Sequence, residues 1–254
     1  YLTMSDIDRL YHDAELVQFY DAQNPWGEFD DMSYCKNMAT DAGSVLDMGC
    51  GTGQFLAGIA EGRLNVGVDP ASAMLDVARA RPNGDQVSWV EGDARTIRLG
   101  QKFDLIVLTG HAFQVFLTDD DRRAVLTTIA EHLKPDGKFI FDSRNPLREA
   151  WREWMESGLQ SKWTVNHPEL GAVEAWSDAS QDALSGVLTY ETHYRIEATG
   201  QVLSAASQIA FPAKEVLAQL IRNVGLSVDR WLGDWQGGTY SEASKEIIPI
   251  GRLK

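Results

Sequence analysis

From Ser44 onward, short apolar runs alternate with amphipathic stretches, and this alternation most constrains the fold. The spacing of apolar residues between the runs predicts helices over 54–61, 72–80 and 119–133. Strands that alternate with helices are joined by right-handed crossovers, which build a mostly parallel sheet with helices on both faces. We therefore predict a doubly wound, Rossmann-like α/β domain. The apolar runs span residues 45–46, 64–68, 87–90, 103–108 and 138–141.

The alternation stops between residues 144 and 212. A Trp-rich helix is expected over 147–157, closed by Gly158. Segments 186–196 and 202–211, joined by a turn at Gly200, then predict a long antiparallel hairpin. Two further strands are expected upstream, at 162–165 and 173–176. This region is an inserted antiparallel sheet.

The α/β pattern resumes after the insertion. Pro212 opens a helix that runs to Asn223, and Gly225 caps it. Strands follow at 226–232 and 246–250. Their connection is too short for an ordinary crossover helix, so we expect these two strands to pair antiparallel.

Composition excludes several classes of protein. The chain has 254 residues and a formal net charge of −14, which repels phosphate backbones and anionic membrane surfaces. We therefore expect no nucleic-acid partner and no membrane partner. Cys35 and Cys50 are too few for a metal cluster or a disulfide framework, which favours a reducing, cytoplasmic location. The first residues do not resemble a secretion signal, and no apolar segment approaches the roughly 18 residues of a membrane span.

A glycine loop, Gly49-Cys50-Gly51-Thr52-Gly53-Gln54, follows the first predicted strand. A dinucleotide fingerprint has glycine at the first, third and sixth places, whereas this loop has Gln54 at the sixth. No Lys-Ser or Lys-Thr pair follows, so the loop is not a phosphate-binding P-loop either. An NAD-dependent oxidoreductase is therefore a weak alternative.

Three acids lie near the ends of three successive strands. Asp47 precedes the glycine loop, where it would repel a pyrophosphate but favour a ligand with an ammonium group. S-adenosylmethionine, with an amino-acid end, a sulfonium and no phosphate, fits this charge pattern. Asp69 can accept ribose hydroxyls, and Asp93 can accept from an adenine amino group. Taken singly, Asp69 could instead cap the next helix and Asp93 could be a turn residue.

With these residues in place, the chain resembles the class I S-adenosylmethionine-dependent methyltransferases. The resemblance covers about residues 10 to 145 and 212 to 252. It implies a seven-stranded sheet whose final strand is antiparallel. The segment 233–241, followed by residues 245–248, resembles a branch with an antiparallel sheet after the fifth strand, many members of which methylate a nitrogen or oxygen of a small molecule. The motifs are VLDMGCGTG, GVDPASAMLDVARA, WVEGDAR, FDLIVLTGHAF and AEHLKPDGKFIFD.

The resemblance also implies roles for individual residues and for three parts of the chain. Residues 1-40 would close over the cofactor, 41-143 and 213-254 would form the core, and 144-212 would be a lid or substrate wall. Either Tyr11 or Tyr20 would cover the cofactor. The remaining implied contacts are Asp47, Gly49 and Gly51 with the methionine moiety, Asp69 with the ribose, Met74, Asp93 and Ala94 with the adenine, and Thr109 and His111 with the sulfonium.

Methyl transfer mainly requires alignment of a nucleophile, together with a group that takes its proton where necessary. His111 is our candidate for that group, although a histidine that only shapes the pocket is an equal alternative. His193 alternates within the predicted hairpin and is more simply structural. We expect no metal ion, because Thr118 and residues 119–121 are better explained as the cap and acidic first turn of a helix.

Two groups of residues have open interpretations. Asp142, Arg144 and Asn145 follow the fifth strand and either orient substrate or form a turn at Asn145-Pro146. Trp residues of the insertion either form an aromatic wall that attracts alkylammonium groups or simply pack in its core. These are Trp151, Trp154, Trp163 and Trp176.

The sequence thus predicts an S-adenosylmethionine-dependent methyltransferase that acts on a nitrogen or oxygen of a small molecule. A non-catalytic S-adenosylmethionine-binding protein is the main alternative. Amino-group methyltransferases that act on adenine or glutamine carry an Asp/Asn-Pro-Pro-aromatic motif, and here Thr109-Gly110-His111-Ala112 stands in its place. The acceptor and the oligomeric state are not specified by the sequence.

Overall fold

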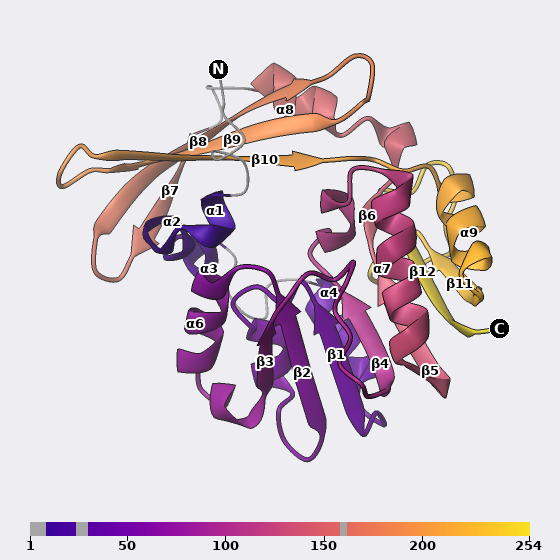
Figure 1. The fold of residues 1–254 in the computed structure, drawn as a ribbon. Coiled ribbons are helices and arrows are strands. Elements are labelled where there is room, and N and C mark those ends of the chain that lie inside the picture. The colour runs from indigo at the N-terminus through magenta and orange to yellow at the C-terminus, as the bar shows by residue number, and fades with distance from the viewer. Residues whose placement is uncertain (1–8, 24–29, 158–161) are drawn as a thin grey trace.

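The computed structural model describes residues 9–23, 30–157 and 162–254. Its central sheet has the strand order β11-β12-β5-β4-β1-β2-β3 (Figure 1). Strands β1 to β5 pair in parallel, whereas β12 is antiparallel to both of its neighbours. The predicted Rossmann-like sheet with an antiparallel final strand is confirmed. The strands are β1 Ser44–Met48, β2 Leu64–Asp69, β3 Ser88–Glu91, β4 Phe103–Leu108, β5 Leu133–Phe141, β11 Leu226–Leu232 and β12 Glu246–Leu253.

One strand of this sheet was not predicted. After β5 the chain passes Asp142 and forms a two-residue strand, β6 Ser143–Arg144, which pairs antiparallel with the start of β12. The sheet therefore has eight strands, not seven. This short pairing places Glu246 opposite Arg144, beside the cavity described below.

Helices cover both faces of the central sheet. Leu46 and Met48 of β1 pack in one cluster with residues of α7 and α9, while Val45 packs on the opposite face with residues of α4 and α5. This is the two-residue alternation expected of a strand buried on both sides. Helix α6 matches its predicted range, whereas α5 ends earlier than predicted. The helices are α4 Asp30–Met38, α5 Gln54–Gly58, α6 Ser72–Ala80, α7 Asp119–His132 and α9 Lys214–Asn223, with short 3-10 turns η2 Gly84–Gln86 and η3 Ala112–Val115.

The inserted region forms a separate antiparallel sheet in the order β10-β9-β8-β7, which lies across the carboxyl edge of the central sheet (Figure 1). The predicted hairpin and both upstream strands are confirmed, and the upstream strands are longer than expected. The predicted Trp-rich helix begins later, at Trp151, and Gly158 lies outside the described residues. The elements are η4 Pro146–Arg148, α8 Trp151–Ser157, β7 Lys162–His167, β8 Gly171–Gln181, β9 Leu188–Ile196 and β10 Val202–Ile209.

Three short N-terminal helices lie between the two sheets (Figure 1). Leu16 and Phe19 are buried against the inserted sheet, where the Phe19 ring stacks on Tyr194 at 4.5 Å. Val17 packs instead against Met74 of α6. The segment therefore bridges insertion and core. The helices are α1 Arg9–His12, α2 Ala14–Val17 and α3 Tyr20–Gln23, and the predicted turn at 24–27 lies outside the described residues.

Within the described part of the chain, no helix combines the length and the apolar character needed to cross a membrane.

Candidate active site

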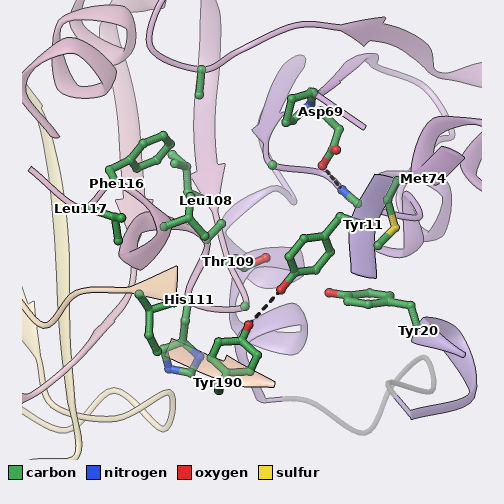
Figure 2. A pocket seen from close by; sticks show the side chains of 18 of the residues that line it. Tyr11, Tyr20, Asp69, Met74, Leu108, Thr109, His111, Phe116, Leu117 and Tyr190 are labelled. Carbon is green, nitrogen blue, oxygen red and sulfur yellow. Dashed lines mark hydrogen bonds between the residues drawn. The ribbon is translucent and has the colours of Figure 1, made fainter. Parts of the chain in front are cut away.

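A cavity of about 1040 Å³ lies between the carboxyl edge of the central sheet and the inserted sheet. The sequence-predicted site residues line it, with the exception of Asp47 (Figure 2). Residues from the N-terminal helices, the core and the insertion therefore meet in one place. The predicted residues that line the cavity are Tyr11, Tyr20, Gly49, Gly51, Asp69, Met74, Asp93, Ala94, Thr109 and His111.

The glycine loop is held in place by the neighbouring strand. Gly49 and Gly51 have φ angles of +80° and +51°, which favour glycine. The N–H of Gly51 donates to the Asp69 carboxylate at 2.8 Å, the bond drawn in Figure 2. The second Asp69 oxygen accepts the N–H of Ala71 at 2.9 Å, just before α6. Asp69 therefore does not cap α6, whose N-cap residue is Ala71, but stabilises the turn before it. Each of its oxygens retains a lone pair for a ligand at the cavity.

Asp47 lies behind the glycine loop instead of in the cavity wall. It is only 3% exposed, and its Oδ1 has no hydrogen-bond partner among the described residues. Burial, reinforced by the carboxylates of Asp69 and Asp31, raises the pKa of Asp47 to about 8. Asp31 accepts the backbone N–H groups of Met32 and Gly110 at 2.7 and 3.2 Å. A buried group of acids with an unsatisfied oxygen fits an ammonium-bearing ligand, as the amino-acid end of S-adenosylmethionine would be.

Asp93 and Ala94 follow β3 and line the cavity. The Asp93 carboxylate accepts from the Arg95 guanidinium at 2.6 Å, and this bond lowers its pKa. Arg95 also reaches Asp121 at 2.8 Å. The turn interpretation of Asp93 therefore holds locally, while the residue still borders the cavity. Met74 is buried on α6 next to the same region.

The run of acids at residues 119–121 forms the first turn of α7, as predicted. The Thr118 hydroxyl accepts the N–H of Asp121 at 3.1 Å and caps the helix. Asp119 and Asp120 pair with arginines one turn later, each at 2.6 Å. Each acid therefore has a structural partner.

Both candidate N-terminal tyrosines face the cavity (Figure 2). Their rings lie edge to face with centroids 6.3 Å apart. The Tyr11 hydroxyl is 3.1 Å from the Tyr190 hydroxyl of β9, so this pair joins the N-terminal segment to the inserted sheet. Burial, followed by the charge of Asp69, raises the pKa of the Tyr20 hydroxyl. The sequence left the choice between the two tyrosines open, and the fold brings both to the site.

His111 lies at a sharp turn after β4, with a φ angle of +61°. Its backbone N–H donates to Asp142 at 2.9 Å, and its Nε2 is 3.0 Å from a Glu246 carboxylate oxygen. The second Asp142 oxygen is 3.6 Å from Nε2. Burial raises the pKa of Asp142 to about 6; the positive charge of His111 opposes this shift, whereas Glu246 and Asp31 add to it. A histidine flanked by two carboxylates is suited to accept a proton.

Glu246 was missed by the sequence reasoning. It is separated from His111 by 135 residues. Residues 245–248 belong to the stretch that resembles the branch, but that resemblance did not mark Glu246 as a site residue. The β6–β12 pairing brings it to the site. The sequence predicted an antiparallel final strand, but it did not predict the register of that strand against β6, which decides that Glu246 lies near His111.

The other residues after β5 have different roles. Arg144 lines the cavity. Asn145 does not: its side-chain amide donates to the backbone oxygens of Glu242 and Ser244 at 3.0 and 2.8 Å, and its side-chain oxygen accepts the N–H of Leu147. These contacts fit the turn interpretation of Asn145.

His193 and the tryptophans of the insertion also separate into two groups. His193 does not line the cavity; its Nδ1 is 2.7 Å from the Ser204 hydroxyl and its ring stacks on Trp176 at 5.0 Å. This arrangement fits its structural interpretation. Trp154 and Trp163 line the cavity, whereas Trp151 packs on Phe211 and Trp176 on His193.

Comparisons with known proteins agree with this site. Residues 45–137 match the family model described as a methyltransferase domain. The chain is 27% identical over 216 residues to the cypemycin N-terminal methyltransferase of Streptomyces sp, covering 83% of each chain. It is 31% identical over 108 residues to the dTDP-3-amino-3,4,6-trideoxy-alpha-D-glucopyranose N,N-dimethyltransferase of Streptomyces venezuelae, covering 42% of this chain and 45% of the relative.

A solved S-adenosylmethionine-dependent methyltransferase from Clostridium acetobutylicum has the same fold, with a TM-score of 0.77 and 15% identity over 94% of this chain and 98% of that one. The chain thus carries a methyltransferase domain over residues 45–137 and has the fold of solved S-adenosylmethionine-dependent methyltransferases. It is an enzyme whose cofactor is S-adenosylmethionine. The two alternatives left by the sequence, a non-catalytic binding protein and an NAD-dependent oxidoreductase, are thereby set aside.

Proposed function

We propose that this enzyme methylates an amino nitrogen of a small molecule, with His111 as the general base. The observation that supports this proposal is the 3.0 Å contact between His111 Nε2 and Glu246 at the wall of the cavity. A carboxylate that accepts the Nε2 proton fixes the tautomer and leaves Nδ1 as the basic nitrogen. Nδ1 of His111 has no hydrogen-bond partner in the described part of the chain.

We assign the cofactor to the half of the cavity formed by the glycine loop and the ends of β2 and β3. The buried acids behind the loop would hold its ammonium group, and Asp69 its ribose hydroxyls. The two tyrosines of the N-terminal segment would cover it. The proposed cofactor residues are Asp47, Gly49, Gly51, Asp69, Met74, Asp93, Ala94, Thr109, Tyr11 and Tyr20.

When bound, the cofactor supplies an electrophilic methyl group on a sulfonium that departs as a neutral thioether. The lone pair of the acceptor nitrogen forms the new C–N bond as the S–C bond breaks, and the electron pair of that bond remains on sulfur. The nitrogen loses a proton to His111 Nδ1, and Glu246 stabilises the imidazolium that results. Asp142 positions the imidazole by accepting the backbone N–H of His111 at 2.9 Å.

The inserted sheet would enclose the acceptor. Trp163, Tyr190 and Thr192 line the cavity from β7 and β9, opposite the core. Their apolar and aromatic surfaces would exclude water while the acceptor is aligned with the methyl group. Residues 144-212 would then serve as the substrate wall.

An amine is the acceptor group that the surroundings of His111 favour. Glu246 and the buried Asp142 lie within 3.0 and 3.6 Å of its Nε2, and negative charge of this kind stabilises an ammonium substrate or product. The two relatives named above act, by their names, on the N-terminus of cypemycin and on a dTDP-linked amino sugar. Both buried cysteines are unpaired, which supports placing this chemistry in the cytoplasm.

Methyl transfer to a metabolite extract tests this proposal. The enzyme would be incubated with S-adenosylmethionine labelled in its methyl group, before and after acetylation of the amines in the extract. We expect acetylation to abolish the labelled product, because an acetylated nitrogen is no longer nucleophilic. A labelled product that survives acetylation and is identified as a methyl ether or ester would instead establish oxygen as the methylated atom.

A further inference from the structure

Two arginines line the cavity, and their charges are balanced very differently. Arg95 lies between Asp93 and Asp121, with contacts of 2.6 and 2.8 Å. Arg144 is also in the cavity wall, but no carboxylate of the described residues lies within ion-pairing distance of it. Its guanidinium is the less compensated of the two positive charges.

The Arg144 side chain is held firmly by neutral groups. Its Nη1 donates to the side-chain oxygen of Gln114 at 2.9 Å. Gln114 is fully buried, and its own amide donates to the backbone oxygen of Ala210 at 2.8 Å, which fixes the direction of its oxygen. The guanidinium carbon lies 5.0 Å from the centroid of the Trp154 ring, which also lines the cavity. The guanidinium is therefore preorganised.

Most of the hydrogen-bonding capacity of Arg144 remains unused. A guanidinium has five N–H donors, and the contact to Gln114 uses one of them. The nearest acid along the neighbouring strand, Glu246, is already bonded to His111. Burial lowers the pKa of Arg144, and the charges of Glu246 and Asp142, which lie beyond ion-pairing distance, oppose this shift. A ligand that supplies negative charge and several acceptors would satisfy the remaining N–H donors.

We propose that Arg144 binds an anionic oxyacid group of the acceptor, so that the substrate is an amine that also carries a carboxylate or phosphate. The planar fork of a guanidinium matches the two oxygens of either group. The protein carries a net charge of −14, which disfavours anions over most of its surface. The Arg144 guanidinium would therefore also fix the orientation of an anionic acceptor in the cavity. This inference rests on the proposed function, which supplies the amine as the methylated group. The amine would lie between Arg144 and the transferred methyl group.

Calorimetry on the full chain loaded with S-adenosylhomocysteine tests the proposal. The probes are inorganic pyrophosphate and succinate, titrated separately to distinguish a phosphate from a carboxylate. We expect at least one of them to bind at millimolar concentration, and Arg144→Gln to weaken that binding at least about tenfold, the loss of one charge-assisted contact. Arg144→Lys retains the charge without the fork and should give an intermediate affinity.

The matched control is Arg148→Gln, an exposed arginine of η4 outside the cavity wall. It should bind the anion as the wild type does. Equal binding by Arg144→Gln, or equal loss in the Arg148 variant, would overturn the proposal, as would failure of both probes to bind. If Arg144→Gln does not fold, an Arg144→Lys variant with unchanged affinity for both anions overturns it instead.

The anion titration is independent of methyl transfer, so the two proposals fail separately. If the wild-type enzyme binds neither anion but still methylates an amine, only the role of Arg144 is refuted. If an anion binds through Arg144 but the methylated atom is an oxygen, only the proposal of a nitrogen acceptor is refuted. In the activity arm, the labelled product from the extract should be retained on an anion-exchange resin at about pH 12, where the amine is neutral and only the oxyacid group is charged. A product that is not retained at that pH contradicts the inference.

Discussion

The two halves of the cavity are built in different ways. In the cofactor half, Gly51 and Asp69 meet across 18 residues, because adjacent parallel strands bring their carboxyl ends to one edge. In the acceptor half, His111 and Glu246 meet across 135 residues. Where the two halves join, Tyr11 of the cofactor half meets Tyr190 of the inserted sheet across 179 residues. On the proposed assignment, the residues for the methyl donor are positioned mainly by local loops, whereas those for the acceptor depend on the register of distant strands.

Their charges differ as well. Behind the glycine loop, Asp47 is buried with an unsatisfied carboxylate oxygen, so that half favours a cation. In the acceptor half, the Arg144 contacts among the described residues are with neutral groups, the Gln114 amide and the Trp154 ring, so its guanidinium favours an anion. A ligand with an ammonium end fits the first half, and one with an oxyacid group fits the second.

The largest expected effect is in the acceptor half, at His111. An asparagine there tolerates the φ of +61° but lacks the basic nitrogen. We expect His111→Asn to lower kcat by roughly 10²- to 10⁴-fold, the usual contribution of a general base. Affinity for S-adenosylhomocysteine, measured by calorimetry, should change little. The control is His193→Asn, outside the cavity wall. A variant that retained full activity would reduce His111 to a residue that shapes the pocket.

Glu246→Gln should have a smaller effect on the same step. Glutamine can still accept the Nε2 proton of His111, but the charge that stabilises the imidazolium is lost. We expect kcat to fall roughly 10- to 100-fold, since hydrogen bonds to charged groups contribute about 1.5–3 kcal/mol. Steady-state kinetics at saturating cofactor measures the change, and the exposed Glu242→Gln serves as control. An equal loss in Glu242→Gln would point to a general disturbance of the segment before β12.

The contrast between the halves also explains how far the sequence could be interpreted. The glycine spacing, Asp69 and the alternation of strands depend on neighbours in the chain. The alternation correctly predicted the central sheet, and the residues predicted at its carboxyl edge line the cavity found there. Glu246 and Gln114 carry no local signal, because their roles arise from the β6–β12 pairing and from the contact of η3 with the end of β10. Asp47 was expected in the cavity wall, but β1 is buried along its whole length and carries the side chain inward.

A change at Asp69 tests the cofactor half. Asp69→Ala removes the acceptor of the Gly51 N–H and the proposed contact with the ribose. We expect affinity for S-adenosylhomocysteine to fall about tenfold or more by calorimetry, with kcat at saturating cofactor altered much less. Asp76→Ala, an exposed acid on α6, is the matched control. Unchanged affinity in Asp69→Ala would refute the ribose assignment and leave Asp69 as a turn residue.

The smallest expected effect concerns stability and pH at Asp47. Its folded-state pKa is raised to about 8, so the folded protein binds its proton more tightly than the unfolded chain does. The stability it contributes is therefore fully present below the unfolded pKa of about 4 and is lost as pH rises toward 8, by up to about 1.4 kcal/mol per pH unit. Asp47→Asn cannot ionise, so its Tm relative to the wild type should rise by a few degrees between pH 5.5 and about 7.5.

Differential scanning calorimetry without cofactor measures this change, and Asp76→Asn should show no such trend because its carboxylate is exposed. The same titration separates the two halves of the cavity. If the Asp47 charge is what the amino-acid end of the cofactor neutralises, saturation with S-adenosylhomocysteine should flatten the pH dependence of the wild type and leave that of Asp47→Asn unaltered. A wild-type Tm that falls equally steeply with and without the ligand would show that Asp47 does not interact with the ammonium group, and the acidic character of the cofactor half would then have to be assigned to Asp31.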